Sequence, residues 1–200
     1  LRRIAPGHCV QADSLLFAGP DVFFPHLLRR YAPASPSVAP SSIGGMAFLR
    51  GRMLASLGIQ QRRGRRYVVR RSSGTRRVLN EVALCEMLVN RWGFEELFPE
   101  TLSFADQVRH FHDADVIVGV QGSALSNCVF CAPGTRVVAL CSRFAANFPA
   151  WAYALECSGV QHCFVVGEAE QGSHFLAIQC DFHIDLEALN NALLSLGVTP

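Results

Sequence analysis

Short apolar runs alternate with amphipathic stretches through most of the chain. The runs YVVR, FEELF, DVIVGV, RVVAL and HCFVVG are predicted strands, at residues 67–70, 94–98, 115–120, 136–140 and 162–167. Between and after them lie segments with the apolar spacing of helices, among them residues 80–93, 103–114 and 185–197. Short, wholly apolar strands that alternate with helices are typical of a parallel sheet covered on both faces. The pattern therefore predicts an α/β fold with a Rossmann-like, doubly wound parallel sheet.

The N-terminal quarter has a different character. Residues 32–45 are rich in Pro, Ser and Gly and form the linker-like segment of the chain, so we place a domain boundary there. We expect residues 1–45 to be a remnant of another lobe plus this linker, and residues 46–200 to be the sheet domain, with a helix at 46–58. Because the chain starts at Leu1 without Met, in sequence typical of a domain interior, we also expect a segment to precede it.

Two of the predicted helices carry specific signals. Asn80 is the expected N-cap of the helix that follows it, and Gly93 its stop. In the helix at 103–114, Phe104, Val108 and Phe111 have the spacing of one buried face, which predicts that all three lie in the core.

All 18 basic residues are arginine, which excludes Schiff-base and phosphate-loop lysines. The net charge is only +2, yet ten arginines and no acid lie between Arg50 and Arg77. Such a local field attracts phosphate groups. Arginines 62, 63, 65 and 66 precede the strand at 67–70, and we expect them to form a solvated surface.

The eight cysteines lie mostly inside apolar runs, which predicts reduced, buried thiols and favours a cytoplasmic protein. Cys128 and Cys131 form a single CxxC. Because no second pair accompanies it, core packing is favoured over zinc binding.

Two loops are expected at the ligand-binding edge of the sheet, where parallel strands end. The first, Arg71–Asn80, follows YVVR, and the second, Val120–Ser123, follows DVIVGV. Guanidinium groups form paired hydrogen bonds with a diphosphate, and a glycine before a helix start lets a phosphate approach the backbone. A solvated basic turn and a purely structural glycine are the alternatives. The sequence contains no Walker A, G-x-G-x-x-G or G-x-S-x-G motif, which disfavours an NAD enzyme.

The segments RYVVRRSSGTRRVLNE and GFEELFPETLSFADQVRHFHDADVIVGVQGSALSNCVFCAPGTRVVAL resemble the C-terminal half of glycosyltransferase family 61. The resemblance is good from Tyr67 to Leu140 and loose from Asp181 to Gly197. It implies the C-terminal lobe of a GT-B glycosyltransferase with part of the N-terminal lobe. It also implies an inverting, metal-independent transfer from a nucleotide-sugar, expected to be a UDP-sugar, to a glycan or protein acceptor, for example in capsule or other surface polysaccharide synthesis.

The same resemblance implies which residues contact the donor. They are Arg71, Arg77, Asn80, Glu81, Gln121, Gly122, Ser123 and Asn127, with Arg70, Arg76 and Gln107 as secondary candidates. Gln121 stands where the family usually has His. A glutamine amide can donate and accept hydrogen bonds, but it cannot act as a proton carrier near neutral pH. The catalytic base stays unassigned and is expected outside this chain.

Two other functions remain open at this stage. The Gln121 substitution favours a non-catalytic relative that binds a nucleotide or glycan. The arginine cluster favours a nucleic-acid-binding module, but few aromatics and no nucleic-acid-binding signature accompany it, so no nucleic acid is expected as a partner. The all-arginine composition favours a bacterial source, and association with a membrane surface would depend on parts that precede the chain.

Overall fold

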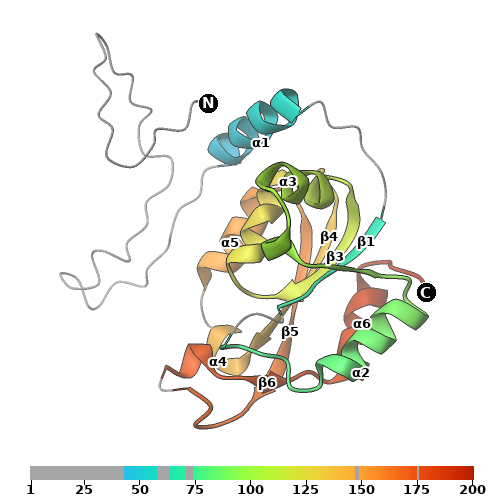
Figure 1. The fold of residues 1–200 in the computed structure, drawn as a ribbon, viewed down its shortest axis with the longest axis vertical. Coiled ribbons are helices and arrows are strands. Elements are labelled where there is room, and N and C mark those ends of the chain that lie inside the picture. Colours follow the sequence, from blue (N-terminus) through green and yellow to red (C-terminus); the bar gives the residue numbers. More distant parts are fainter. Residues whose placement is uncertain (1–42, 58–63, 71–73, 147–148, 175) are drawn as a thin grey trace, which may run out of the picture.

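A six-stranded sheet forms the centre of the protein (Figure 1). The computed structural model describes residues 43–57, 64–70, 74–146, 149–174 and 176–200. The strands are β1 (Gly64–Val68), β2 (Glu95–Leu97), β3 (Ala114–Val120), β4 (Arg136–Ser142), β5 (Gln161–Ala169) and β6 (Phe182–His183). The α-helices are α1 (Ile43–Leu57), α2 (Glu81–Glu86), α3 (Phe104–His112), α4 (Arg143–Ala146), α5 (Pro149–Cys157) and α6 (Leu186–Ser195). Residues 9–18, whose sequence CVQADSLLFA predicts one more strand, lie outside these residues.

The five predicted strands all exist and pair in parallel, in the order β2-β1-β3-β4-β5. The sixth strand was not predicted. β6 pairs antiparallel with the end of β5, through Glu168 with His183 and Ala169 with Phe182, so the sheet is mostly rather than wholly parallel. A strand of two residues is too short to leave a periodic pattern in the sequence.

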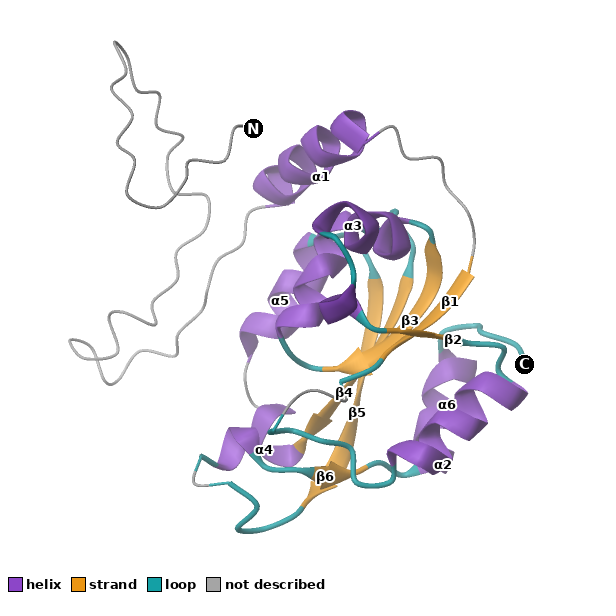
Figure 2. Ribbon diagram, viewed as in Figure 1, coloured by secondary structure: helices purple, strands orange, loops and turns teal. Residues whose placement is uncertain are grey.

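Helices cover both faces of the sheet, as the alternating pattern predicted (Figure 2). On one face, α2 and α6 bury Leu84, Leu189 and Leu193 against alternate strand residues such as Val118 and Leu140. On the other face, α3, α5 and the 3-10 helix η4 (Ser123–Phe130) form a second core cluster. Both faces of the sheet are therefore covered by helices, and a ligand can approach the sheet at the ends of its strands.

The strand order places a topological switch point between β1 and β3. The chain runs from β1 through α2 to β2 on one side, then returns across β1 through α3 to β3 on the other. Loops leave the carboxyl ends of β1 and β3 toward opposite faces, which opens a crevice between them. The two loops singled out in the sequence border this crevice.

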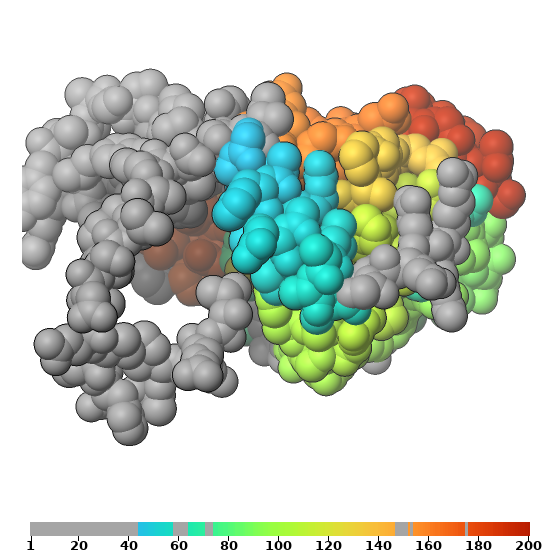
Figure 3. All heavy atoms as spheres, turned by 90° about the horizontal axis from the view of Figure 1, so that it is seen from above, coloured from blue at the N-terminus to red at the C-terminus, as the bar shows by residue number. Residues whose placement is uncertain are grey.

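Helix α1 packs on the outside of α3 and η4, through Met46, Met53 and Leu54. In Figure 3 it lies across one face of the molecule in blue to cyan, beside the yellow-green surface that includes α3. The helix begins at Ile43, so the last residues of the expected linker, 43–45, belong to it. No described helix has the length and apolar content required to cross a membrane.

Two of the arginines before the predicted strand, Arg65 and Arg66, do not form a solvated surface. Arg65 and Arg66 belong to β1 itself, and both side chains are partly buried. Arg65 donates to the Trp92 carbonyl, and Arg66 pairs with Glu95 at 2.5 Å. The long arginine stems cover the sheet edge while their charged ends find acceptors, a placement that apolar periodicity does not reveal. Residues 62 and 63 lie outside the described residues.

One expectation about side chains on helices was wrong, and another was confirmed in position but not in its hydrogen bond. Phe104 is 54% exposed, although Val108 and Phe111 are fully buried as predicted. As the first residue of α3, Phe104 reaches past the core and meets only the edge of the Phe130 ring. Asn80 precedes α2, but its side chain makes no capping hydrogen bond and instead exchanges two hydrogen bonds with the backbone of Ile184.

Gly93 ends the second helical segment in the way the sequence predicted. Helix α2 continues as a π-helical turn, η2 (Met87–Arg91), and Gly93 follows with φ +64°, donating its N–H to the Val89 carbonyl.

Replacing Gly93 by alanine should lower the free energy of unfolding by about 1 kcal/mol, because an L side chain is strained at this φ. Urea unfolding would measure it. Gly51→Ala, inside α1, should instead raise the free energy of unfolding, because alanine favours a helix more than glycine does. Equal changes in the two variants would contradict strain at Gly93 as the cause.

Candidate functional site

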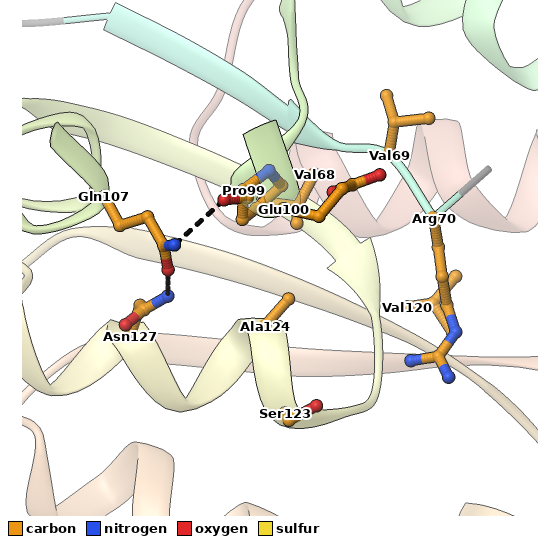
Figure 4. Close-up of a pocket in the computed structure, with 10 residues that line it drawn as sticks. All are labelled: Val68, Val69, Arg70, Pro99, Glu100, Gln107, Val120, Ser123, Ala124 and Asn127. Atoms are coloured by element: carbon orange, nitrogen blue, oxygen red, sulfur yellow. Dashed lines mark hydrogen bonds between the residues drawn. The ribbon is translucent and has the colours of Figure 1, made fainter. Parts of the chain in front are cut away.

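A pocket of about 430 Å³ lies at the switch point, beyond the carboxyl ends of β1 and β3 (Figure 4). Its walls come from the ends of these strands, from the turn after β2, from α3 and from the start of η4. The lining residues are Val68, Val69, Arg70, Pro99, Glu100, Gln107, Val120, Ser123, Ala124 and Asn127. The pocket therefore includes both ends of the loop Val120–Ser123, and from the first strand it reaches Arg70, the residue before the loop Arg71–Asn80.

Two arginines converge on the backbone at the start of η4. A Cβ atom added to Gly122 would lie 2.6 Å from Nη1 of Arg70 and 3.7 Å from Nη1 of Arg76. Arg76 also donates from Nη1 to the Gln121 carbonyl at 3.0 Å, and Arg70 donates from Nε to the Thr75 carbonyl at 3.3 Å. Gly122 is buried, and its lack of a side chain makes room for both guanidinium groups.

The two guanidinium groups lie close together without a counter-charge. Neither pairs with a carboxylate of the described residues, and Nε of Arg76 is buried without a hydrogen-bond partner there. Burial lowers the pKa of Arg70, and burial together with the neighbouring Arg70 lowers the pKa of Arg76. Both shifts mean that the charged form of each guanidinium group is disfavoured in the folded protein. A bound anion would offset this unfavourable free energy.

The loop that carries Arg76 is docked on the C-terminal part of the chain. Arg77 donates its backbone N–H to Oδ1 of Asp181 at 2.7 Å and its guanidinium to Oδ2 at 2.9 and 2.6 Å. The Arg76 N–H donates to the Gln179 carbonyl, and Phe182 donates to the Arg77 carbonyl. Arg76 has φ +56°, the left-handed region that a non-glycine residue enters at a cost. These contacts hold it there and direct its side chain toward Gly122.

The Asp181 carboxylate is almost completely buried, and Arg77 governs its ionisation. Burial works to raise the pKa of Asp181, but the hydrogen bonds and charge of Arg77 outweigh it, so the pKa lies below its ordinary value. The same pairing raises the pKa of Arg77. Arg77 is thus committed to Asp181, and the prediction that it contacts a diphosphate stays a prediction.

On the far side of the pocket, two amide side chains support the turn after β2. Asn127 donates from Nδ2 to Oε1 of Gln107 at 2.9 Å, and Gln107 donates from Nε2 to the Pro99 carbonyl at 2.9 Å (Figure 4). Both residues line the pocket. In this structure their polar atoms bind each other and the backbone.

Gln121 and Ser123 flank the glycine. Gln121 is buried, and its Oε1 atom has no partner among the described residues. Ser123 is exposed at the first position of η4. The helix expected here is a 3-10 helix, whose N-terminal N–H groups nevertheless face the switch point.

Asn80 and Glu81 do not line the pocket. Glu81 accepts a hydrogen bond from the buried Tyr67 hydroxyl, and Asn80 binds Ile184. Arg71, a first-choice diphosphate ligand, lies outside the described residues. Sequence reasoning missed Glu100, which lines the pocket, because a carboxylate after a short strand has no distinguishing motif.

Five of the seven described cysteines are buried, and Cys85 and Cys163 are partly buried. No disulfide joins any of these seven, and Cys128 and Cys131 lie in the core. Burial raises the pKa of Cys131, which keeps it protonated. No group of three or more metal-ligating side chains occurs in the part of the chain that the structure describes.

The sequence model of Glycosyltransferase 61 matches residues 7–138, well over half of the chain. The chain belongs to the glycosyltransferase 61 family. A comparison with curated proteins finds no match. The family match begins far before Tyr67, where the resemblance seen in the sequence starts, and it does not reach Asp181–Gly197. In this glycosyltransferase 61 chain the matched segment includes the pocket residues. It does not include Gln179, Asp181 or Phe182, which hold the loop that carries Arg76 and Arg77 (the arginine loop).

A substitution at Gly122 tests whether room for the arginines matters in this glycosyltransferase 61 chain. With φ 171° the backbone at Gly122 suits any residue, but the alanine methyl would displace the flexible end of Arg70. Gly122→Ala should weaken binding of UDP about tenfold, the loss of one charged hydrogen bond, with little change in melting temperature. Calorimetry and thermal unfolding measure the two quantities. Large destabilisation with unchanged affinity would contradict this account.

Proposed function

We propose that the chain transfers a sugar from a nucleotide-sugar donor, with the donor diphosphate bound between Arg70, Arg76 and the start of η4. The family supports a glycosyltransferase. The observation that carries the proposed site is the pair of partly buried guanidinium groups without a carboxylate, over the Gly122 backbone. A diphosphate would bring the missing counter-charge.

The chemistry follows from where charge develops. As the bond between the anomeric carbon and the phosphate oxygen breaks, the sugar becomes cationic and the nucleoside diphosphate gains negative charge. Two fixed guanidinium groups and the N–H groups at Gly122 and Ser123 stabilise that charge without having to reorganise. In this proposal arginines do the work that a divalent ion does in other transferases. The acceptor attacks from the opposite face in one displacement, which inverts the anomeric configuration.

The donor is proposed to be a UDP-sugar and the acceptor a glycan or glycosylated protein. Calorimetry of the full chain with UDP, GDP, dTDP and uridine tests the binding step. A panel of UDP-, GDP- and dTDP-sugars, followed by release of nucleoside diphosphate, tests turnover. We expect UDP to bind and uridine to bind much more weakly, since the diphosphate carries the charge. Absence of binding by all the nucleoside diphosphates would refute the proposal. Binding without any turnover would favour a non-catalytic nucleotide-binding relative.

A further inference from the structure

Glu100 supplies the one carboxylate among the residues that line the switch-point pocket. It belongs to the 3-10 turn η3 (Pro99–Thr101), which follows β2. In Figure 4 its side chain extends from this turn toward the side of the pocket on which Arg70 lies. The pocket thus holds a cationic group and an anionic group on walls that different strands provide.

The backbone that carries Glu100 is fixed on both sides. Within the turn, Thr101 donates to the Phe98 carbonyl at 3.0 Å and Leu102 to the Pro99 carbonyl at 3.1 Å. The Pro99 carbonyl also accepts the hydrogen bond from Gln107, which Asn127 orients from η4. Helix α3, the helix η4 and the turn itself therefore determine the backbone position of Glu100, and its exposed side chain can reach a bound acceptor from there.

The other polar side chains of the pocket cannot accept a proton at neutral pH. Arg70 is already protonated, Gln107 and Asn127 are amides, and Ser123 is a weakly basic hydroxyl. Transfer to a sugar or protein hydroxyl needs a base within hydrogen-bond reach of that hydroxyl. Among the lining residues, the carboxylate of Glu100 is the group with the required chemistry.

We propose that Glu100 is the catalytic base of the transfer reaction. The inference rests on the proposed function. The acceptor hydroxyl gives its proton to a carboxylate oxygen of Glu100, and its oxygen forms the new bond to the anomeric carbon. The bond from that carbon to the phosphate oxygen breaks, and its electron pair leaves with the nucleoside diphosphate toward Arg70 and Arg76. The base then lies within this chain rather than outside it.

Glu100→Gln tests the proposal, because it keeps the shape of the side chain and removes its basicity. The assay uses the nucleotide-sugar that the unmodified chain turns over fastest in the panel. We expect release of nucleoside diphosphate to slow by about 10²- to 10⁴-fold, the usual contribution of a general base. The affinity for UDP should change less than twofold. Azide needs no deprotonation, so it should restore release and yield the glycosyl azide of inverted configuration.

Glu86→Gln, on the exposed surface of α2, is the matched control and should leave rate and affinity unchanged. A Glu100→Gln variant that keeps its rate within threefold overturns the proposal. So does one that loses donor affinity as strongly as rate, since Glu100 would then bind the sugar. Failure of azide to raise the rate also overturns it. If the unmodified chain binds UDP but turns over no donor, Glu100 is not a base although the nucleotide site stands, whereas no nucleotide binding refutes the proposed function itself.

Gln107 acts in this scheme as a positioning residue. Gln107→Met removes the hydrogen bond to the Pro99 carbonyl at similar volume. We expect a lower kcat with an unchanged KM for the donor. Combined with Glu100→Gln it should slow the reaction no further, because residues that act as one unit are not additive. Independent, multiplicative losses would overturn the positioning role.

Discussion

Replacing Arg70 and Arg76 together by alanine is expected to weaken UDP binding by at least 100-fold, and each single replacement by about 10- to 100-fold. A hydrogen bond to a charged partner contributes about 1.5–3 kcal/mol, and 1.4 kcal/mol corresponds to a tenfold change in affinity. Both guanidinium groups reach the same backbone position at Gly122, so one diphosphate would contact both. Calorimetry with UDP measures the effect.

The same replacements should leave the unliganded protein as stable or make it more stable. The pKa of Arg76 is lowered by burial and by Arg70, which means that the folded state alone disfavours the second charge. Removing one arginine relieves this repulsion. A loss of affinity together with an unchanged or raised melting temperature is therefore the signature of a binding site rather than of a structural pair.

Two comparisons make this test specific. Uridine lacks phosphate, so its affinity should change little in the arginine variants. Arg52→Ala removes an exposed arginine of α1 and should not affect UDP. If the double variant binds UDP as well as the unmodified chain, the diphosphate lies elsewhere.

Asp181→Asn is expected to destabilise the protein by about 1–3 kcal/mol at pH 7 and to weaken UDP binding about tenfold. The asparagine side chain would lack the negative charge that pairs with the exposed Arg77 guanidinium, and its NH₂ group would face donors of Arg77. Neither Asp181 nor Arg77 lines the pocket. The loss of affinity would arise because the released loop no longer holds Arg76 in its left-handed conformation.

The pH dependence of stability should identify the same contact. The pKa of Asp181 is lowered in the folded state, so its contribution is complete above the unfolded value, about 3.9, and disappears as pH falls through the folded value. The unmodified chain should therefore lose stability in acid, whereas Asp181→Asn should lose less over the same range. Urea unfolding at pH 7 and pH 3 measures this. Asp106→Asn, which breaks an exposed pair with Arg109, should change stability clearly less. Unchanged UDP affinity in Asp181→Asn would contradict the positioning of Arg76.

The sequence was sufficient for the five parallel strands, for the main helices and for the sheet edge at which the pocket lies, because these follow from local periodicity. It did not distinguish among neighbouring arginines. Arg76 and Arg77 are adjacent, yet one reaches Gly122 and the other Asp181. The difference depends on the positive φ of Arg76 and on partners about a hundred residues away, and neither leaves a local pattern.

Glu100 and β6 were missed for related reasons. Both matter through what a distant segment brings beside them, Gln107 and η4 in one case and the end of β5 in the other. Asn80 shows the reverse error. Its local sequence is that of a cap, but Ile184 competes successfully for its side chain. Tertiary contacts thus decide the use of a polar residue once the element that carries it is in place.

Because the arginine loop docks on residues 179–182, the order in which parts of the chain can fold during synthesis on the ribosome is restricted. Arg77 and Asp181 are separated by 104 positions, and the strands β1 to β5 all precede Asp181. A nascent chain can therefore assemble its parallel sheet while the loop that carries Arg76 and Arg77 still lacks its anchor. We expect UDP to begin protecting the growing chain from protease only after Asp181 and Phe182 have left the exit tunnel.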